Sequence, residues 1–374
     1  MKKQQWKSIA ITVAVACIAV LTIVSSTLYL LFGSLDNGWK MARSLYLVRT
    51  QYVHRLDSNR MMEGMLSGLL KSTDDVYSEY LSQESYRRLQ EAIEGTHVGV
   101  GLLLSQKDSL IYVQEVIPGG NAEKAGVISI GDRIDQVDGK TVADMDLTEV
   151  VKRISGQEGT QVTLNLCRTN GESYSQVLVR GHFIVPTVSS RLLKDSIAYV
   201  RIRSFTEETP MEFRKEFEQL RFHGMRKLII DLRNNPGGSL HAVTEVGKQL
   251  LPQGIFVTII SRNGDKDVIR LPGAPDAVPL VILINRNSAS ASEILASAVQ
   301  DLEAGKIVGE KSYGKGTVQG VFSLSAHDGI RLTVAEYFSP KGHSINGRGV
   351  IPDIYLDNAV ATEDQWLEAA MQTL

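Results

Sequence analysis

One stretch of sequence decides the fold of the C-terminal half of the chain: Leu280-Val-Ile-Leu-Ile284-Asn-Arg-Asn-Ser288-Ala-Ser290-Ala-Ser292-Glu293-Ile294. Its first five residues are all apolar, which predicts a strand buried on both faces. Three alternating serines follow and lead into a helical pattern over residues 290–302. Hydroxyls and unpaired backbone N–H groups thus meet at a helix N-terminus, which suits the binding of an oxyanion. Because Ser and Asn also cap ordinary helices, a catalytic interpretation requires a base elsewhere.

The surrounding segments alternate between strand and helix patterns. Such alternation predicts an α/β layer with a largely parallel sheet, in which sites gather where strands end and helices begin. Residues 183–374 are therefore expected to form one α/β core. The predicted strands cover residues 197–202, 227–231, 256–260 and 280–284, and the predicted helices cover 210–222, 240–251 and 290–302.

Histidine patterns do not supply the base. The seven histidines form no HExxH motif, and the chain has no GxSxG motif. A lysine does stand between two glycines in Tyr313-Gly-Lys315-Gly-Thr-Val-Gln319, in a predicted turn before a strand. Such a lysine is either a solvated turn residue or, if burial lowers its pKa, a base that can deprotonate a serine hydroxyl. Ser312-Tyr-Gly-Lys315 also matches SxxK, but its glycine disfavours the helix that this motif needs.

A second source of backbone donors is predicted in the segment Asp231-Leu-Arg-Asn-Asn-Pro-Gly-Gly238. Here a buried strand ends in a Pro-Gly-Gly turn ahead of a helix, and the glycines expose N–H groups that side chains would cover. We expect one of these N–H groups to act as a second oxyanion donor.

The first 35 residues indicate a membrane anchor. No charged residue occurs between Lys7 and Asp36, and residues 9–32 are long enough to cross a hydrocarbon core of about 30 Å as a helix. Lysines precede this stretch, which favours a cytoplasmic N-terminus and an extracytoplasmic location for the chain from about residue 36. A cleaved signal peptide is the alternative, although the apolar stretch exceeds a usual signal-peptide core.

Two further regions lie between this anchor and the core. Residues 36–94 carry apolar residues at helical spacing, which predicts a helical N-terminal region. Residues 95–182 change to short strands broken by glycine turns, which predicts a small independent domain. Its predicted elements are strands at 98–104, 110–116 and 162–167, helices at 122–125 and 147–154, and a hairpin turn at Asp138-Gly139.

Composition excludes several classes of function. With 40 basic and 42 acidic residues, the chain has no large field for attracting nucleic acid. Its two cysteines, Cys17 and Cys167, provide neither a disulfide framework nor a zinc cluster. No nucleic acid, metal ion or organic cofactor is therefore implied.

Together the motifs resemble the carboxyl-terminal processing peptidases, also called tail-specific proteases. The match covers nearly everything after the anchor and keeps the order of the family's motifs. One departure is Asp75-Val76, where relatives usually have Asp-Pro. The matching motifs are Asp75-Val-Tyr-Ser-Glu-Tyr80-Leu, Val98-Gly-Val-Gly101, Gly131-Asp-Arg-Ile, Asp231-Leu-Arg-Asn-Asn-Pro-Gly-Gly238, Ser288-Ala-Ser-Ala-Ser-Glu293, Gly314-Lys-Gly-Thr-Val-Gln319 and Gly349-Val-Ile-Pro-Asp353.

The resemblance implies a serine protease core with layers of the crotonase and Clp-protease kind. In that family the middle serine of Ser-Ala-Ser-Ala-Ser is the nucleophile, which maps to Ser290. The lysine of Gly-Lys-Gly-Thr-Val-Gln is the general base and maps to Lys315, and Gln319 would orient it.

The same resemblance implies an oxyanion hole and one supporting acidic residue. The N–H of Ala291 would act with an N–H from Gly237 or Gly238, because two such donors stabilise the tetrahedral intermediate of acyl transfer. Asp301 falls where some relatives carry an important aspartate, and it can equally be an ion-pair partner.

Residues 95–182 then resemble a PDZ domain inserted ahead of the core. Gly99-Val100-Gly101-Leu102 would be the loop whose N–H groups bind a C-terminal carboxylate, with the peptide added as a strand. In relatives this domain gates the protease. The implied partners are unfolded or C-terminal peptides, the membrane through the N-terminal helix and, as in some relatives, a second copy of the chain.

These inferences predict a serine endopeptidase that is anchored in the cell membrane by one span and cleaves extracytoplasmic proteins near their C-termini. The predicted parts are an anchor (1–35), a helical region (36–94), a PDZ-like domain (95–182) and a protease core (183–374). Two other functions stay open. A membrane-anchored PDZ scaffold without catalytic activity would not need the serine, lysine and glutamine together, and a crotonase-like acyl-CoA enzyme would lack its substrate outside the cytoplasm.

Overall fold

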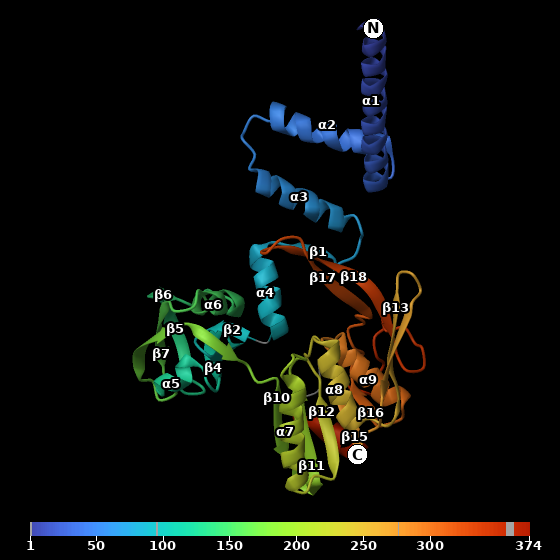
Figure 1. Ribbon diagram of the computed structural model, residues 1–374. Coiled ribbons are helices and arrows are strands. Elements are labelled where there is room, and N and C mark those ends of the chain that lie inside the picture. The colour runs from blue at the N-terminus through green and yellow to red at the C-terminus, as the bar shows by residue number, and fades with distance from the viewer. Residues whose placement is uncertain (1, 95, 276, 357–362) are drawn as a thin grey trace. The chain divides into compact units, whose positions relative to one another are not determined.

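The computed structural model describes residues 2–94, 96–275, 277–356 and 363–374 (Figure 1). The chain separates into two units, one ending at Ser72 and one beginning at Thr73. The predicted boundary between the helical region and the PDZ-like domain falls at residue 95, which lies outside the described residues.

The first unit consists of three helices, α1 (Lys2–Phe32), α2 (Leu35–Gln51) and α3 (Ser58–Lys71). Within α1, Thr12–Phe32 is long and apolar enough to cross a membrane. Ser34 caps α2, because its hydroxyl accepts the N–H of Asn37 at 3.1 Å. Gly38 lets α2 approach α1 closely: a Cβ at this position would lie 3.0 Å from a methyl carbon of Leu28.

A small β-rich body follows in the second unit. Its sheet has the order β3-β4-β5-β7-β8, with β6 beside β5, and β2 pairs separately with β9. Buried side chains such as Ile111, Val150 and Leu164 form its own hydrophobic cluster. The elements are α4 (Gln83–Glu94), β2 (Thr96–Gly99), β3 (Leu102–Lys107), β4 (Leu110–Val116), α5 (Asn121–Ala125), β5 (Arg133–Val137), β6 (Lys140–Thr141), α6 (Leu147–Ile154), β7 (Gln161–Cys167), β8 (Ser173–Val179) and β9 (Gly181–Ile184).

The strand predicted over residues 98–104 is wrong, because the chain breaks it at Gly101. Gly101 has a φ of 81°, and a Cβ there would lie 2.7 Å from the Cα of Gly120. β2 and β3 are therefore separate strands. The predicted hairpin turn is present, with φ of 50° at Asp138 and 72° at Gly139.

The core contains a six-stranded sheet of order β10-β11-β12-β15-β16-β19, in which only β10 is antiparallel to its neighbour. Ile230 and Ile282 pack in one cluster with α7, α8 and α9, whereas Ile229 and Leu283 pack in another with α10. Burial on both faces explains why residues 280–284 are apolar throughout. The elements are β10 (Val188–Leu192), a 3₁₀ turn (Lys194–Ser196), β11 (Ile197–Ile202), α7 (Thr209–Phe222), β12 (Lys227–Asp231), α8 (Leu240–Leu250), β15 (Leu280–Ile284), α9 (Ala291–Asp301), β16 (Lys306–Gly309), β19 (Ile354–Tyr355) and α10 (Glu363–Thr373).

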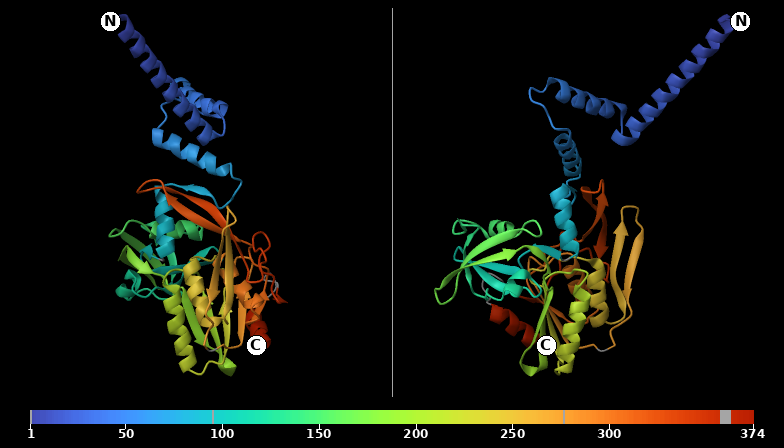
Figure 2. Two further views of the ribbon diagram at one scale, coloured as in Figure 1. Left: turned by 45° about the vertical axis from the view of Figure 1, so that its right-hand side comes forward. Right: turned by 60° about the vertical axis from the view of Figure 1, so that its left-hand side comes forward.

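A second, antiparallel sheet was not predicted. Its order is β1-β18-β13-β14, with β17 also paired to β18, and Figure 2 shows β13 and β14 as a long hairpin. The strand predicted at 256–260 lies in β13 and so belongs to this sheet rather than to the parallel layer. β1 likewise interrupts the region predicted to be wholly helical. The strands are β1 (Glu79–Leu81), β13 (Gly254–Ser261), β14 (Lys266–Leu271), β17 (Thr317–Ser323) and β18 (Gly329–Phe338).

Candidate active site

The structure separates the middle serine of the triplet from its two neighbours. The Ser288 hydroxyl donates to the carbonyl of Leu232 at 2.7 Å, and the Ser292 hydroxyl donates to the carbonyl of Asn235 at 3.0 Å. Both are fully buried, so they tie α9 to the loop that follows β12. Ser290 is partly exposed and faces a cavity, so of the three hydroxyls only this one can meet a substrate.

Ser290 stands at a strained turn immediately before α9. Its φ of 56° lies in the left-handed region, which costs a residue with a side chain about 1–3 kcal/mol. The Ser290 N–H donates to Glu293 Oε2 at 2.8 Å, which holds the turn in this conformation. The hydroxyl of Tyr337 on β18 contacts the Ser290 side chain. The strained turn thus fixes the position of the Ser290 side chain at the start of α9.

Glu293 lies at the centre of this site, although the sequence motifs assigned it no role. Its carboxylate is fully buried and accepts four hydrogen bonds. Oε2 accepts from the N–H groups of Ser290 and Lys315 at 2.8 and 2.9 Å. Oε1 accepts from the N–H of Gly314 at 2.6 Å and from the hydroxyl of Ser312 at 2.5 Å. In the sequence, Glu293 could have been found from the Ser-x-x-Glu spacing of a capping box. Its carboxylate also binds the loop that carries the lysine.

The lysine loop ends against this carboxylate, and Lys315 is half-buried. Burial lowers the pKa of Lys315, and the charge of Arg331 lowers it further, while Asp75 and Glu293 act in the opposite direction. Burial also raises the pKa of Glu293, although its four donors oppose that shift. A lysine whose pKa is lowered carries a neutral amine over a wider pH range, as a general base requires.

The predicted orienting residue has other partners in this structure. The Gln319 amide donates to the Thr317 hydroxyl at 2.8 Å and to the Thr333 hydroxyl at 3.3 Å. Thr333 also hydrogen bonds to the Asp75 carboxylate, and this bond, with one from Ser78, lowers the pKa of Asp75 against the effect of burial. Gln319 is thus linked to Lys315 indirectly: it bonds to Thr333, Thr333 bonds to Asp75, and the charge of Asp75 acts on the lysine.

Backbone donors beside Ser290 come from the Pro-Gly-Gly turn. A Cβ on Gly237 would lie 2.7 Å from the Ser290 Cβ and 2.8 Å from the N of Ala291, so this turn passes directly against the start of α9. The Gly237 N–H already donates to Asn235 Oδ1 at 2.8 Å. Among the described hydrogen bonds, none uses the N–H of Gly238 or of Ala291. Of the three predicted oxyanion donors, the N–H groups of Gly238 and Ala291 thus have no acceptor among the described hydrogen bonds, whereas that of Gly237 has one.

One cavity of about 1460 Å³ brings most of the predicted site residues together. It also contains apolar residues of β3 and α6, including Leu103 and Val151. Asp301 does not line it; it ends α9, and its carboxylate accepts the N–H of Lys341 at 2.9 Å. The predicted residues that line the cavity are Ser290, Lys315, Gln319, Ala291, Gly237, Gly238, Gly99, Val100, Gly101 and Leu102.

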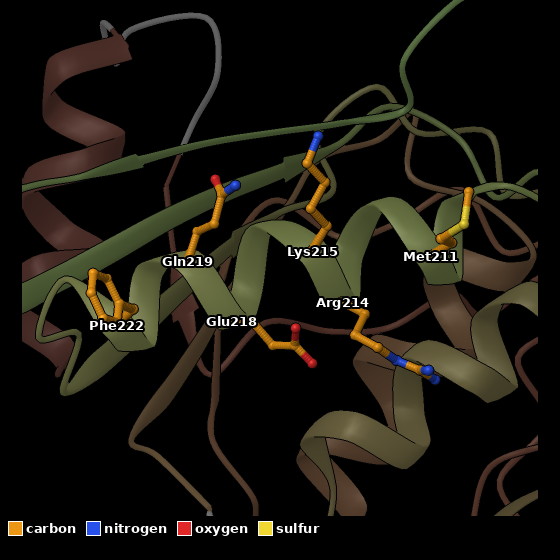
Figure 3. A pocket seen from close by; sticks show the side chains of 6 residues that line it. All are labelled: Met211, Arg214, Lys215, Glu218, Gln219 and Phe222. Atoms are coloured by element: carbon orange, nitrogen blue, oxygen red, sulfur yellow. The ribbon is translucent and has the colours of Figure 1, made fainter.

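A second, smaller hollow of about 440 Å³ lies along α7 (Figure 3). Its six lining side chains all come from this one helix, from Met211 to Phe222, and none is a predicted site residue. Within the described part of the chain, no group of three or more His, Cys, Asp or Glu side chains is placed to hold a metal ion. The predicted catalytic residues therefore lie in the large cavity and not in this hollow.

Comparison with known proteins identifies the family of the chain. The model of peptidase family S41 matches residues 196–356, a PDZ domain model matches 112–168, and a model of the activating protease CtpB N-terminal domain matches 31–85. The carboxy-terminal processing protease CtpA of Bacillus subtilis is 31% identical over 317 residues, covering 84% of this chain and 68% of that protein. The carboxy-terminal-processing protease of Bartonella bacilliformis is 35% identical over 319 residues, covering 83% and 73%.

A solved structure supports the same grouping. The photosystem II D1 C-terminal processing protease is 31% identical, with a TM-score of 0.54, and the match covers 88% of this chain and 89% of that one. A protease core of this fold joined to a PDZ domain defines a serine peptidase of the C-terminal processing class. The chain belongs to peptidase family S41, among the carboxy-terminal processing proteases. The family and the fold class predicted from the motifs are thereby confirmed.

The close approach of Gly237 to Ser290 predicts a large loss of activity for Gly237→Ala. The new methyl group would push against the Ser290 Cβ and the N of Ala291, and one misplaced oxyanion donor costs about 100- to 1000-fold in kcat. Gly342→Ala is the matched control, because Gly342 also has a positive φ (81°), but a Cβ there would meet no side chain or backbone within 4 Å beyond its chain neighbours. Steady-state cleavage of an unfolded protein measures both variants; equal kcat values would show that the turn does not shape the site.

Proposed function

We propose that this chain is an endopeptidase of the Ser–Lys dyad type, with Ser290 as nucleophile and Lys315 as general base. One observation carries the proposal: the backbone N–H groups of both residues bind the same carboxylate oxygen of Glu293. This places the only exposed hydroxyl of the serine triplet and a half-buried lysine in one cavity. Gln319 would support the lysine through Thr333 and Asp75.

The chemistry follows from these positions. Neutral Lys315 takes the proton of the Ser290 hydroxyl as its oxygen attacks the substrate carbonyl. The N–H groups of Ala291 and Gly238 bind the oxyanion that forms, and the lysine ammonium then protonates the leaving amine. Water then takes the place of the amine: neutral Lys315 accepts a proton from the attacking water and returns it to the Ser290 oxygen as the acyl ester bond breaks. Because the base must be neutral, activity should rise with pH as Lys315 loses its proton, and the lowered pKa brings this rise closer to neutral pH.

The dyad predicts that Ser290→Ala and Lys315→Ala each abolish cleavage of casein by the full-length chain in detergent. The loss should be about a thousandfold or more, because members of a catalytic unit are not independent. Lys311→Ala, four residues before the base and exposed, should cleave at the parent rate. Wild-type rates in both active-site variants would overturn the assignment, and an inactive parent that no C-terminal peptide activates would favour the PDZ scaffold.

We further propose that a C-terminal peptide binds in the PDZ domain beside β3 and gates cleavage. β3 pairs only with β4 in the described sheet, so its other edge can accept a peptide strand. Gly99 to Leu102 lie at the start of that edge, in the same cavity as Ser290. Binding there is therefore placed to affect the catalytic residues.

Gating predicts that a peptide with a free C-terminal carboxylate accelerates casein cleavage, whereas the same peptide with a C-terminal amide does not. Val151→Glu should remove the acceleration, because Val151 of α6 lines the cavity beside β3. Val179→Glu on β8 is the control, since both valines are 43% exposed and Val179 lies outside the cavity. Equal responses of the two variants, or activation by the amide, would contradict this role.

The proposed location of the protein, at the cell membrane, rests on helix α1. The stretch Thr12–Phe32 meets the length and composition of a membrane span, and its apolar side chains, such as those of Leu21 and Leu30, are exposed. We infer a single-pass anchor (1–35) and a largely helical region (36–94) that includes the short strand β1, followed by a PDZ domain (95–182) and protease core (183–374) that act outside the cytoplasm on protein C-termini.

A further inference from the structure

The motif Asp75-Val-Tyr-Ser-Glu-Tyr80-Leu enters the proposed chemistry only through Asp75, yet a second of its residues, Tyr77, also lies against the base. We call residues 75–81 the entry segment, because they lie close to the start of the second unit, which begins at Thr73. Their end forms β1, which pairs antiparallel with β18 and puts Glu79 opposite Arg331. Arg331 holds the segment at two points: it donates to the Tyr77 carbonyl at 3.1 Å and forms an ion pair with Glu79 at 2.8 Å.

Tyr77 places its ring over the proposed base. The Lys315 Nζ lies 4.8 Å from the centre of the Tyr77 ring, within the range of a cation–π contact. The Tyr77 hydroxyl hydrogen bonds to Tyr313, two residues before the lysine, and the Tyr77 N–H donates to Asp75 Oδ1 at 3.0 Å. The ring is thus fixed from the entry segment, from β18 and from the lysine loop itself.

Three charged side chains from different elements act on Lys315. Asp75 comes from the entry segment, Glu293 from α9 and Arg331 from β18. Tyr337, also on β18, donates its hydroxyl to the Lys315 carbonyl, and burial raises its pKa well above the usual range. Burial, followed by the bond to Tyr313, raises the pKa of Tyr77 to about 12. Both phenols are therefore neutral where the lysine titrates, and the ring of Tyr77 acts on it without a charge.

We propose that Tyr77 is a positioning residue for the base, whose ring holds the Lys315 ammonium in place and keeps water away from it. The entry segment then sets the proton affinity of the base, although no atom of it takes part in the reaction. This inference rests on the proposed dyad, since only a lysine that acts as a base needs such control.

The ring exerts two effects of opposite sign on the lysine. Covering the amine excludes water, which favours the neutral form. The negative face of the ring attracts the ammonium, which favours the charged form. Substitutions that remove one effect or both should therefore move the titration of Lys315 in different directions, which a merely structural role of Tyr77 would not do.

The test measures the titration of Lys315 directly, without relying on activity. The full-length chain carrying Ser290→Ala is acylated with a trace of acetic anhydride at a series of pH values in detergent, and the modification of each lysine is quantified by mass spectrometry. Lys311, exposed and four residues upstream, serves as the internal reference. Tyr77→Phe, Tyr77→Leu and Tyr77→Ala are compared with the parent.

Tyr77→Phe keeps the ring and should leave the Lys315 profile in place. Tyr77→Leu keeps an apolar cover without the ring, so the profile should move to lower pH by about half a unit. Tyr77→Ala opens the amine to water, so the profile should move to higher pH by about one unit or more. The same shifts should appear in the rise of kcat/KM with pH when Ser290 is restored.

Profiles that stay in place in the Leu and Ala variants, or that move together in one direction, would overturn the proposal. Tyr77→Leu keeps the test decisive if Tyr77→Ala fails to fold. Failure of the dyad gives a different result, because Lys315→Ala would then still cleave casein whatever the acylation profiles show.

Discussion

The buried carboxylate of Glu293 joins the two segments that carry the proposed nucleophile and base. Its Oε2 accepts the N–H of Ser290 and the N–H of Lys315, which are 25 residues apart in the sequence, at 2.8 and 2.9 Å. Leaving one buried donor unpaired costs about 1–3 kcal/mol, so four donors on one side chain make a strong constraint. The strained φ of Ser290 and the position of the lysine loop both depend on it.

The remaining parts of the site are assembled around this constraint. Ser288 and Ser292 tie the start of α9 to the loop after β12, which brings the Gly-Gly turn against Ser290. β18 closes the other side with Tyr337 and Arg331, and it also carries the entry segment through β1. The antiparallel sheet therefore contributes to the site alongside the parallel one, because it shapes the surroundings of the lysine.

Much of this arrangement could be predicted from the sequence. The apolar run 280–284 and the alternation around it indicated the parallel sheet, and short motifs led to Ser290, Lys315 and the glycine turn. The antiparallel sheet could not be found in the same way, because β13 has the pattern of a strand but its partner β18 lies far along the chain. The roles of Glu293 and Tyr77 also depend on contacts with distant segments, and the amide of Gln319 bonds to threonines that no spacing rule indicates. The spacing of apolar residues and the short motifs identify helices, strands and candidate site residues. The hydrogen-bond partners of those residues depend on the tertiary fold.

The most direct test of this account is the reactivity of Ser290 in Glu293→Gln. Whichever way the amide is turned, its NH₂ group faces a backbone N–H that needs an acceptor. Either the N–H groups of Ser290 and Lys315 lose their common acceptor, or the N–H of Gly314, next to the lysine, loses its own, so the joint between the two segments is weakened in both cases. Labelling by a fluorophosphonate, mapped by mass spectrometry, should fall more than tenfold at Ser290, with a lower Tm. Glu303→Gln, a largely exposed acid just beyond α9, should label like the parent. Parent-rate labelling of Ser290 in a fully stable Glu293→Gln protein would contradict the claim that this carboxylate holds the site together.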